Sequence, residues 1–89
     1  MYSYEILPSL QKILNKLAKR NKALYEEVLK KIQEVINSEG VEHYKNLRYD
    51  MKDKKRVHIG HFVLVLKFIQ SENKIVFVDF DHHDTIYQK

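Results

Sequence analysis

The sequence predicts an α+β fold: an N-terminal strand and a two-helix antiparallel hairpin packed on one face of a three- to four-stranded, mainly antiparallel sheet. Two observations predict it. Residues 9–36 repeat apolar side chains at helical spacing, whereas residues 62–69 and 75–80 form apolar runs of strand length that are rich in Val, Ile and Phe. No repeat or linker divides the 89 residues, so we expect residues 1–89 to form one small domain.

The N-terminal part of the chain predicts a strand followed by two helices. Its first residues alternate, with Tyr2, Tyr4 and Ile6 on one side, as in a half-buried strand. Pro8 suits the first turn of a helix, and Asn21 suits a cap between two helices. The apolar stripes of these helices consist of Leu10, Ile13, Leu14, Leu17 and Ala18 and of Leu24, Val28, Ile32, Val35 and Ile36.

The middle of the chain leads from the helices into the sheet. Gly40 is expected to stop the second helix, and residues 41–55 predict either a short strand or an irregular lead-in. Residues 56–59 predict a strand that turns at Gly60. Residues 62–69 are apolar on both sides for most of their length, which predicts a central strand with helices on at least one face.

The last strand is expected over residues 75–80, joined to the central strand by residues 70–74 as a hairpin. Regular alternation divides its side chains between two faces. We expect one face to carry Val76, Val78 and Phe80, and the other to carry Ile75, Phe77, Asp79 and Asp81.

Composition excludes several classes of protein. The chain contains no cysteine, so it can form neither a disulfide nor a thiolate site. Its longest unbroken apolar run, residues 62–66, is far too short to span a bilayer, and no signal-peptide pattern opens the chain. We therefore expect a cytoplasmic protein that does not contact a membrane.

The formal net charge of +4 is concentrated just before the predicted hairpin. This local excess favours a polyanionic partner, either nucleic acid or an acidic protein segment, although a solvated lysine-rich loop is an equally good interpretation of charge alone. The candidate RNA- or phosphate-binding residues are Lys45, Arg48, Lys52, Lys54, Lys55 and Arg56.

Histidines mark the candidate site. His58 and His61 precede the hairpin of the two apolar strands, and His82 and His83 follow it, so antiparallel pairing would bring them together. Cleavage of RNA by internal transfer needs a base for the 2′-hydroxyl proton, an acid for the leaving 5′-oxygen and positive charge on the phosphate. The histidines can supply the acid and the base, the cations can supply the charge, and Tyr87 can act as a donor or as a platform for a base.

Two other interpretations of the histidines remain. His82 and His83 could bind a divalent metal with Asp79, Asp81 and Asp84, but their spacing is no recognised ligand pattern, so we predict no metal site and no cofactor. The histidines could also be ordinary hydrogen-bonding residues at strand ends.

The layout and two motifs resemble the RelE/ParE toxin superfamily. The first motif is Arg56-Val57-His58-Ile59-Gly60, which leads into an apolar strand, and the second runs from His82 to Tyr87 as His-x-x-x-Ile-Tyr. Many members of the superfamily have Arg-Val-Gly-x-Tyr-Arg at the first place and Gly-His-Arg-x-x-Ile-Tyr at the second. The likeness in layout extends over essentially the whole chain.

This resemblance implies a RelE-like toxin of a toxin–antitoxin pair. Such toxins enter the ribosomal decoding site and cut mRNA by attack of the ribose 2′-hydroxyl on the adjacent phosphate, without a metal, and a RelB-like antitoxin wraps and neutralises them. The chain departs from the family pattern, because His61 and Phe62 stand at the Tyr-Arg positions and His83 stands where an arginine is usual. The departures imply a histidine-based variant.

Two alternative functions follow from the same resemblance. A ParE-like protein would inhibit DNA gyrase and would not need clustered proton-transfer residues. A catalytically weak homologue would act as a binding module for an acidic, partly disordered antitoxin that folds on contact.

Overall fold

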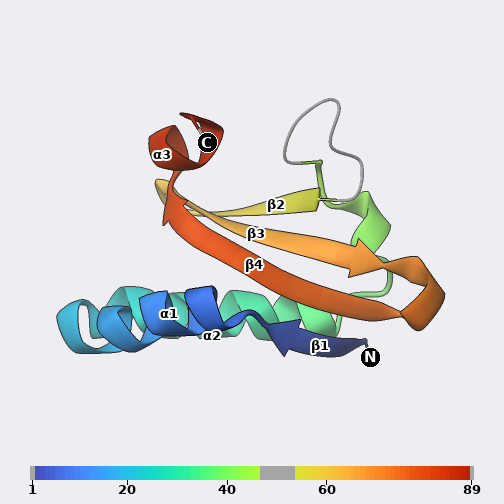
Figure 1. Cartoon of the computed structure of the whole chain (residues 1–89), viewed down its shortest axis with the longest axis horizontal. Coiled ribbons are helices and arrows are strands. Elements are labelled where there is room, and N and C mark those ends of the chain that lie inside the picture. The colour runs from blue at the N-terminus through green and yellow to red at the C-terminus, as the bar shows by residue number, and fades with distance from the viewer. Residues whose placement is uncertain (1, 47–53, 89) are drawn as a thin grey trace.

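The computed structural model describes residues 2–46 and 54–88 and confirms the predicted α+β architecture. Helices α1 and α2 form a layer under the sheet, and the short helix α3 lies on the opposite side (Figure 1). The elements in chain order are β1 (Ser3–Ile6), α1 (Pro8–Arg20), α2 (Lys22–Ile36), the 3-10 helix η1 (Val41–His43), β2 (Lys54–Ile59), β3 (Phe62–Ile69), the 3-10 helix η2 (Gln70–Glu72), β4 (Lys74–His82) and α3 (His83–Gln88).

A single residue joins the two long helices. Helix α1 begins at Pro8, whose fixed φ and missing N–H suit a first helical turn. Asn21 ends α1 by donating its backbone N–H to the Leu17 carbonyl, at 2.8 Å. Its side-chain oxygen accepts a hydrogen bond from the Leu24 N–H at 3.2 Å and so caps α2. This predicted cap leaves no room for a loop, and the helices fold back on each other.

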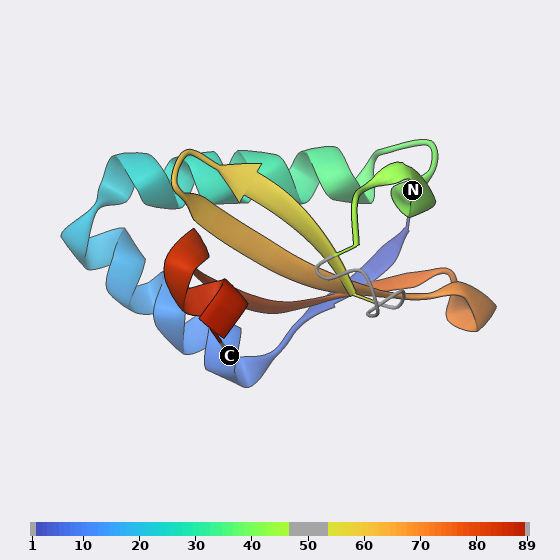
Figure 2. The same ribbon diagram turned by 90° about the horizontal axis from the view of Figure 1, so that it is seen from above.

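The sheet has the strand order β1-β4-β3-β2. Both β2–β3 and β3–β4 are antiparallel, whereas β1 runs parallel to β4. The helical hairpin carries the chain from β1 at one edge of the sheet to β2 at the other (Figure 2). An ion pair between Lys74 and Glu5, with a separation of 2.9 Å, links β1 and β4. The predicted central strand, β3, thus lies inside the sheet, with the helices on one of its faces.

A bulge in the β3–β4 pairing changes the face assignment of β4. Val65 pairs with Asp79 but Leu66 pairs with Phe77, so Val78 is one residue more than β3 can match. Beyond the bulge the alternation continues in the opposite phase. Phe80 is therefore buried in the helix-side core with Ile75 and Phe77, and the prediction that grouped Phe80 with Val76 and Val78 is wrong.

The main core lies between the sheet and the helical hairpin, and a second, smaller one lies on the far side of the sheet. In the smaller core, Ile86 of α3 packs on Val63 and Val65 of β3. The sequence pattern predicts no element after the last strand, so α3 is an additional element. Among the described residues, no helix is both long and apolar enough to cross a membrane.

The uncertain lead-in is irregular where the structure describes it. Residues 41–43 form η1, and Asn46 makes an isolated antiparallel bridge with Lys55. Residues 47–53 lie outside the described part of the chain. Gly60, in the turn between β2 and β3, has a φ of +61°, a left-handed conformation that glycine adopts without strain.

Phe77 is fully buried, so replacing it with alanine leaves a cavity between the sheet and the helices. We expect Phe77→Ala to lower the free energy of unfolding by about 3–5 kcal/mol in urea denaturation. The control is Leu29→Ala on α2, because Leu29 is 37% exposed and alanine favours helix equally; its cost should be about 0.5 kcal/mol. Equal effects of the two changes would contradict this account of the core.

Candidate functional site

Several of the candidate residues lie on the sheet face opposite α1 and α2, which we call the outer face. Val57 and Ile59 of β2 point into the helix-side core, so the residues between and before them, Arg56 and His58, belong to the outer face. Helix α3 covers part of this face through Ile86 (Figure 1). Strand β2 therefore forms one edge of the outer face, and α3 packs on part of it.

Three of the four predicted histidines come together at one end of the β3–β4 ladder. We call His61, His82 and His83 the histidine cluster. The ring centroids of His82 and His83 are 4.6 Å apart, and those of His61 and His82 are 6.2 Å apart with nearly parallel planes. Pairing of Phe62 with His82 places the end of β4 beside the β2–β3 turn, as antiparallel pairing predicts.

Backbone contacts fix the cluster at the start of α3. The His83 N–H donates to the His61 carbonyl at 2.9 Å, and the His83 Nδ1 lies 3.2 Å from the same oxygen. One carbonyl in the turn therefore holds both the backbone and the ring of His83. This contact also anchors the first residue of α3 to the turn that leads into β3, the strand on which the helix packs.

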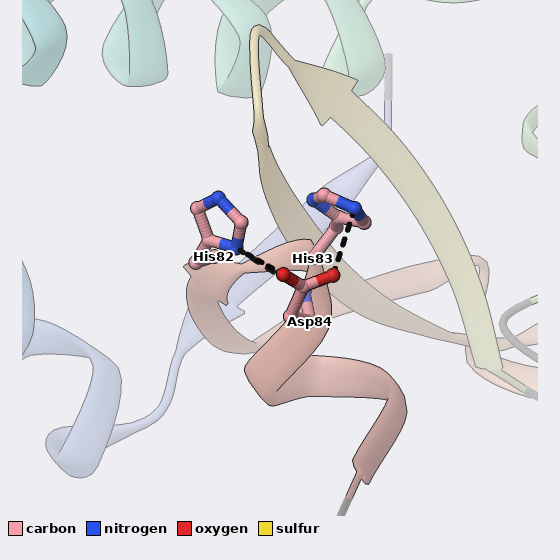
Figure 3. A group of neighbouring side chains, drawn as sticks. All are labelled: His82, His83 and Asp84. Atoms are coloured by element: carbon pink, nitrogen blue, oxygen red, sulfur yellow. Dashed lines mark hydrogen bonds and ion pairs between the residues drawn. The ribbon is translucent and has the colours of Figure 1, made fainter.

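Asp84 lies between the rings of His82 and His83 (Figure 3). Its Oδ1 is 3.0 Å from His83 Nε2, and its Oδ2 is 3.7 Å from His82 Nδ1. The Asp84 N–H also donates to His82 Nδ1 at 3.2 Å. The side chains of both histidines are about two-fifths exposed, at 41% and 42%, so the group is held in place yet open to solvent.

Arg56 and Tyr87 form a second feature of the outer face. Arg56 Nη1 donates to the Tyr87 hydroxyl at 2.6 Å, and the guanidinium carbon lies 5.8 Å from the centroid of the tyrosine ring. Arg56 Nε is buried and has no hydrogen-bond partner among the described residues. His83 and Tyr87 are four residues apart in α3, so they lie on the same side of that helix.

The structure separates the cations of the predicted basic segment. Lys54 alternates with Arg56 and shares the outer face, whereas Lys55 points to the other face and donates to the Asn46 side chain at 2.7 Å. Lys45 is exposed in the lead-in, and its carbonyl accepts from the Arg56 N–H at 2.9 Å. Two further candidates, Arg48 and Lys52, lie outside the described residues.

His58 is apart from the histidine cluster. It is exposed on β2, opposite Val63, and lines a groove with Gly60 and charged residues of α2, among them Glu27 and Lys31. No ring contact among the described residues joins it to the other histidines. His43 stacks on Tyr44 in the lead-in, with ring centroids 4.7 Å apart, and takes no part in the site.

Two residues of the site were not among the sequence-based candidates. Lys67 is exposed and pairs with Lys54, which adds a cation to the outer face. In the sequence, the alternation of Val63, Val65 and Lys67 indicates that these side chains share one face of the strand. Because this strand is apolar on both faces for most of its length, the sequence does not show that this face is the exposed one. Asp84 was considered only as a metal ligand, and its place between two histidines depends on the start of α3.

The arrangement combines two imidazoles that can take up or release a proton, a carboxylate that positions them, and an arginine that holds a tyrosine. It also brings three metal-ligating side chains together. In the described part of the chain, His82, His83 and Asp84 are the one such group, with ligand atoms within 4.8 Å of one another.

Tyr87→Phe should destabilise the protein, because Arg56 then loses the acceptor of its hydrogen bond in a half-buried position. We expect the free energy of unfolding to fall by about 1–2 kcal/mol. Tyr4→Phe is the matched control, since Tyr4 is 50% exposed and should tolerate the change within about 0.5 kcal/mol. Unchanged stability in Tyr87→Phe would mean that the bond contributes nothing to the fold.

Comparison with known proteins places the chain in a family. No family model matches it. A Methanocaldococcus jannaschii protein named "Putative toxin RelE4" is 51% identical over 90 residues, which cover 100% of this chain and 94% of that protein. A chain of the intact E. coli RelBE toxin–antitoxin complex matches the fold with a TM-score of 0.75 at 20% identity, covering 92% of this chain and 96% of that one. A chain of the archaeal RelE–RelB complex from Pyrococcus horikoshii matches with a TM-score of 0.67 at 15% identity, covering 92% and 94%. These two likenesses show the fold, and the close relative shows that the chain belongs to the RelE toxin family.

Proposed function

We propose that this chain is the toxin of a toxin–antitoxin pair and cuts mRNA on the ribosome. The reaction is attack of a ribose 2′-hydroxyl on the adjacent phosphate, with release of the 5′-oxygen of the next nucleotide. The observation that carries the proposal is the placement of His83 and Tyr87 on one side of α3, with Tyr87 held by Arg56. This arrangement would bring a group for proton transfer and a group for phosphate binding to the same side of α3.

Proton transfer is assigned to the pair His82 and His83. Internal transfer requires a base and an acid at neighbouring oxygens of one phosphate, and two imidazoles whose centroids are 4.6 Å apart can serve both. The His61 carbonyl and the Asp84 carboxylate hold the His83 ring, so its orientation is set before RNA arrives. The ring of His61, beside His82, is a further candidate in the same cluster.

Phosphate binding is assigned to Arg56. Its Nη1 is occupied by Tyr87, but the planar guanidinium has further donors, and its permanent charge suits a phosphate on which negative charge builds. Lys54 and Lys67 extend this positive charge along the outer face toward the rest of the RNA. His58, at the edge of the same face, is left as an RNA-contacting residue outside the proton-transfer pair.

Tyr87 is assigned to the RNA base. Arg56 fixes its hydroxyl, and the partly buried ring can stack through its exposed part on a base that has been splayed out of the message. The role needs an aromatic ring more than a hydroxyl. A phenylalanine at this position should retain more activity than an alanine.

The proposed partners follow from the family. The Pyrococcus horikoshii relative was crystallised as a RelE–RelB complex, and the proposed partner of this chain is a RelB-like antitoxin. Acidic side chains of such a partner would pair with the cations of the outer face and hide the histidines from RNA. Action on ribosomes would place the protein in the cytoplasm.

The test is cleavage of mRNA on programmed ribosomes, read by primer extension, with naked RNA beside it. We expect cuts within the ribosome-protected codon. His83→Ala should lower the cleavage rate about 100-fold or more, as expected for loss of a proton-transfer group. His43→Ala is the matched control, because it removes an exposed histidine outside the site.

Circular dichroism would establish that each variant is folded. Full activity in His83→Ala would contradict the role of the histidine cluster. Absence of cuts by folded wild-type protein would instead contradict the endonuclease proposal, and tight antitoxin binding by such a protein would favour the binding-module alternative.

A further inference from the structure

We propose that His82, His83 and Asp84 form a binding site for one divalent transition-metal ion of the Zn²⁺ type, and that the bound ion holds the toxin inactive. The inactivation, but not the binding, rests on the proposed function. This differs from the expectation from sequence, which was no metal site.

The strand-to-helix junction makes the site. In a regular strand His82 and His83 would point to opposite faces of the sheet. Because β4 ends at His82 and α3 begins at His83, the chain turns between them, and both rings flank the Asp84 carboxylate (Figure 3). Their ligand atoms lie within 4.8 Å of one another, close enough for modest side-chain rotations to bring them around one ion.

The hydrogen bonds of His83 favour a cation in this place. A neutral imidazole carries one N–H, and the other nitrogen is an acceptor. His83 Nδ1 lies 3.2 Å from the His61 carbonyl, which can only accept, so the proton of the neutral ring belongs on Nδ1. The bare Nε2 then faces the Asp84 Oδ1 at 3.0 Å.

Two lone pairs that face each other at this distance repel, unless a cation lies between or beside them. The cation is either a second proton on the ring or a metal ion. A carbonyl that accepts from one imidazole nitrogen while the other binds metal is the usual outer-shell arrangement of a histidine ligand. His82 Nδ1 accepts a hydrogen bond from the Asp84 N–H, so this nitrogen is unprotonated, and its lone pair can bind an ion in place of that hydrogen bond.

The donor set selects the class of ion. Two imidazole nitrogens and one carboxylate oxygen suit Zn²⁺, Ni²⁺ or Cu²⁺, whereas Mg²⁺ and Ca²⁺ prefer oxygen ligands alone. The Asp84 side chain is 69% exposed, so an ion can enter from solvent, and water can complete its coordination. Exposure also makes the site reversible.

A bound ion conflicts with RNA cleavage. An imidazole nitrogen that donates its lone pair to a metal cannot take a proton from a 2′-hydroxyl. The same two histidines would therefore be unavailable for acid–base work while the ion is bound. Release of the ion restores them.

The binding test is calorimetric titration of ZnCl₂ into the untagged full-length chain, with MgCl₂ as the comparison ion. We expect one Zn²⁺ per chain and no response to Mg²⁺. His82→Ala and His83→Ala should each weaken binding by about tenfold or more, and Asp84→Asn should weaken it less. His43→Ala should bind as the wild type does. Absence of uptake, or equal uptake by all variants, would overturn the site and leave the proton as the cation.

The inactivation test uses the programmed-ribosome assay with metal-free protein. Adding Zn²⁺ at the concentration that fills the site should reduce cleavage about tenfold, and a zinc-selective chelator that spares Mg²⁺ should restore it. Unchanged or faster cleavage with the site filled would overturn inactivation. If metal-free protein cuts nothing, the proposed function fails, whereas the calorimetric result still decides the metal site.

Discussion

The bulge between β3 and β4 is the constraint on which the two faces of the sheet depend. Regular alternation would direct Asp79 and Asp81 into the helix-side core, where unpaired carboxylates are costly. The extra residue, Val78, shifts the phase, so that Phe80 fills the core beside Phe77 and the acidic side chains leave it. One inserted residue thus reconciles an apolar core with a charged outer face.

The same strand pairing creates the candidate site at its end. Phe62 pairs with His82, which brings the turn after β2 against the start of α3. The His61 carbonyl then accepts from the His83 backbone and lies within reach of its ring. The site is therefore assembled from backbone contacts of ordered elements, and not from a loop that must close on a ligand. Pre-organisation of this kind suits both proton transfer and metal binding.

Histidine at position 83, and not arginine, sets the chemistry that this part of the site can perform. An arginine at the position of His83 would carry a permanent charge and could neither bind a metal nor exchange a proton near neutrality. Histidine can do both, and Asp84 is placed to serve either use. Arg56 remains as the fixed charge of the outer face, tied to Tyr87. The outer face therefore combines one permanent positive charge with a side chain that can change its protonation or bind a metal ion.

The sequence alone determined the elements whose signal is local. Helical spacing with Pro8 and Asn21 defined α1 and α2, and the apolar runs defined β3 and β4, because periodicity and capping depend on neighbours in the chain. It also predicted that His61 lies beside His82 and His83, since antiparallel pairing follows from a short linker. The same argument grouped His58 with them, but His58 lies within β2, three residues before His61, and pairs with Val63 away from the histidine cluster.

Only the tertiary structure decided the bulge, the helix α3, the parallel pairing of β1 with β4 and the position of Asp84. A bulge reflects competition between two pairing registers, and a six-residue helix is too short to show a period. Asp84 reaches both histidines because α3 docks on Val63 and Val65 through Ile86, a contact between segments about twenty residues apart. Such features depend on which surfaces are buried together, and that is settled only when the whole chain has folded.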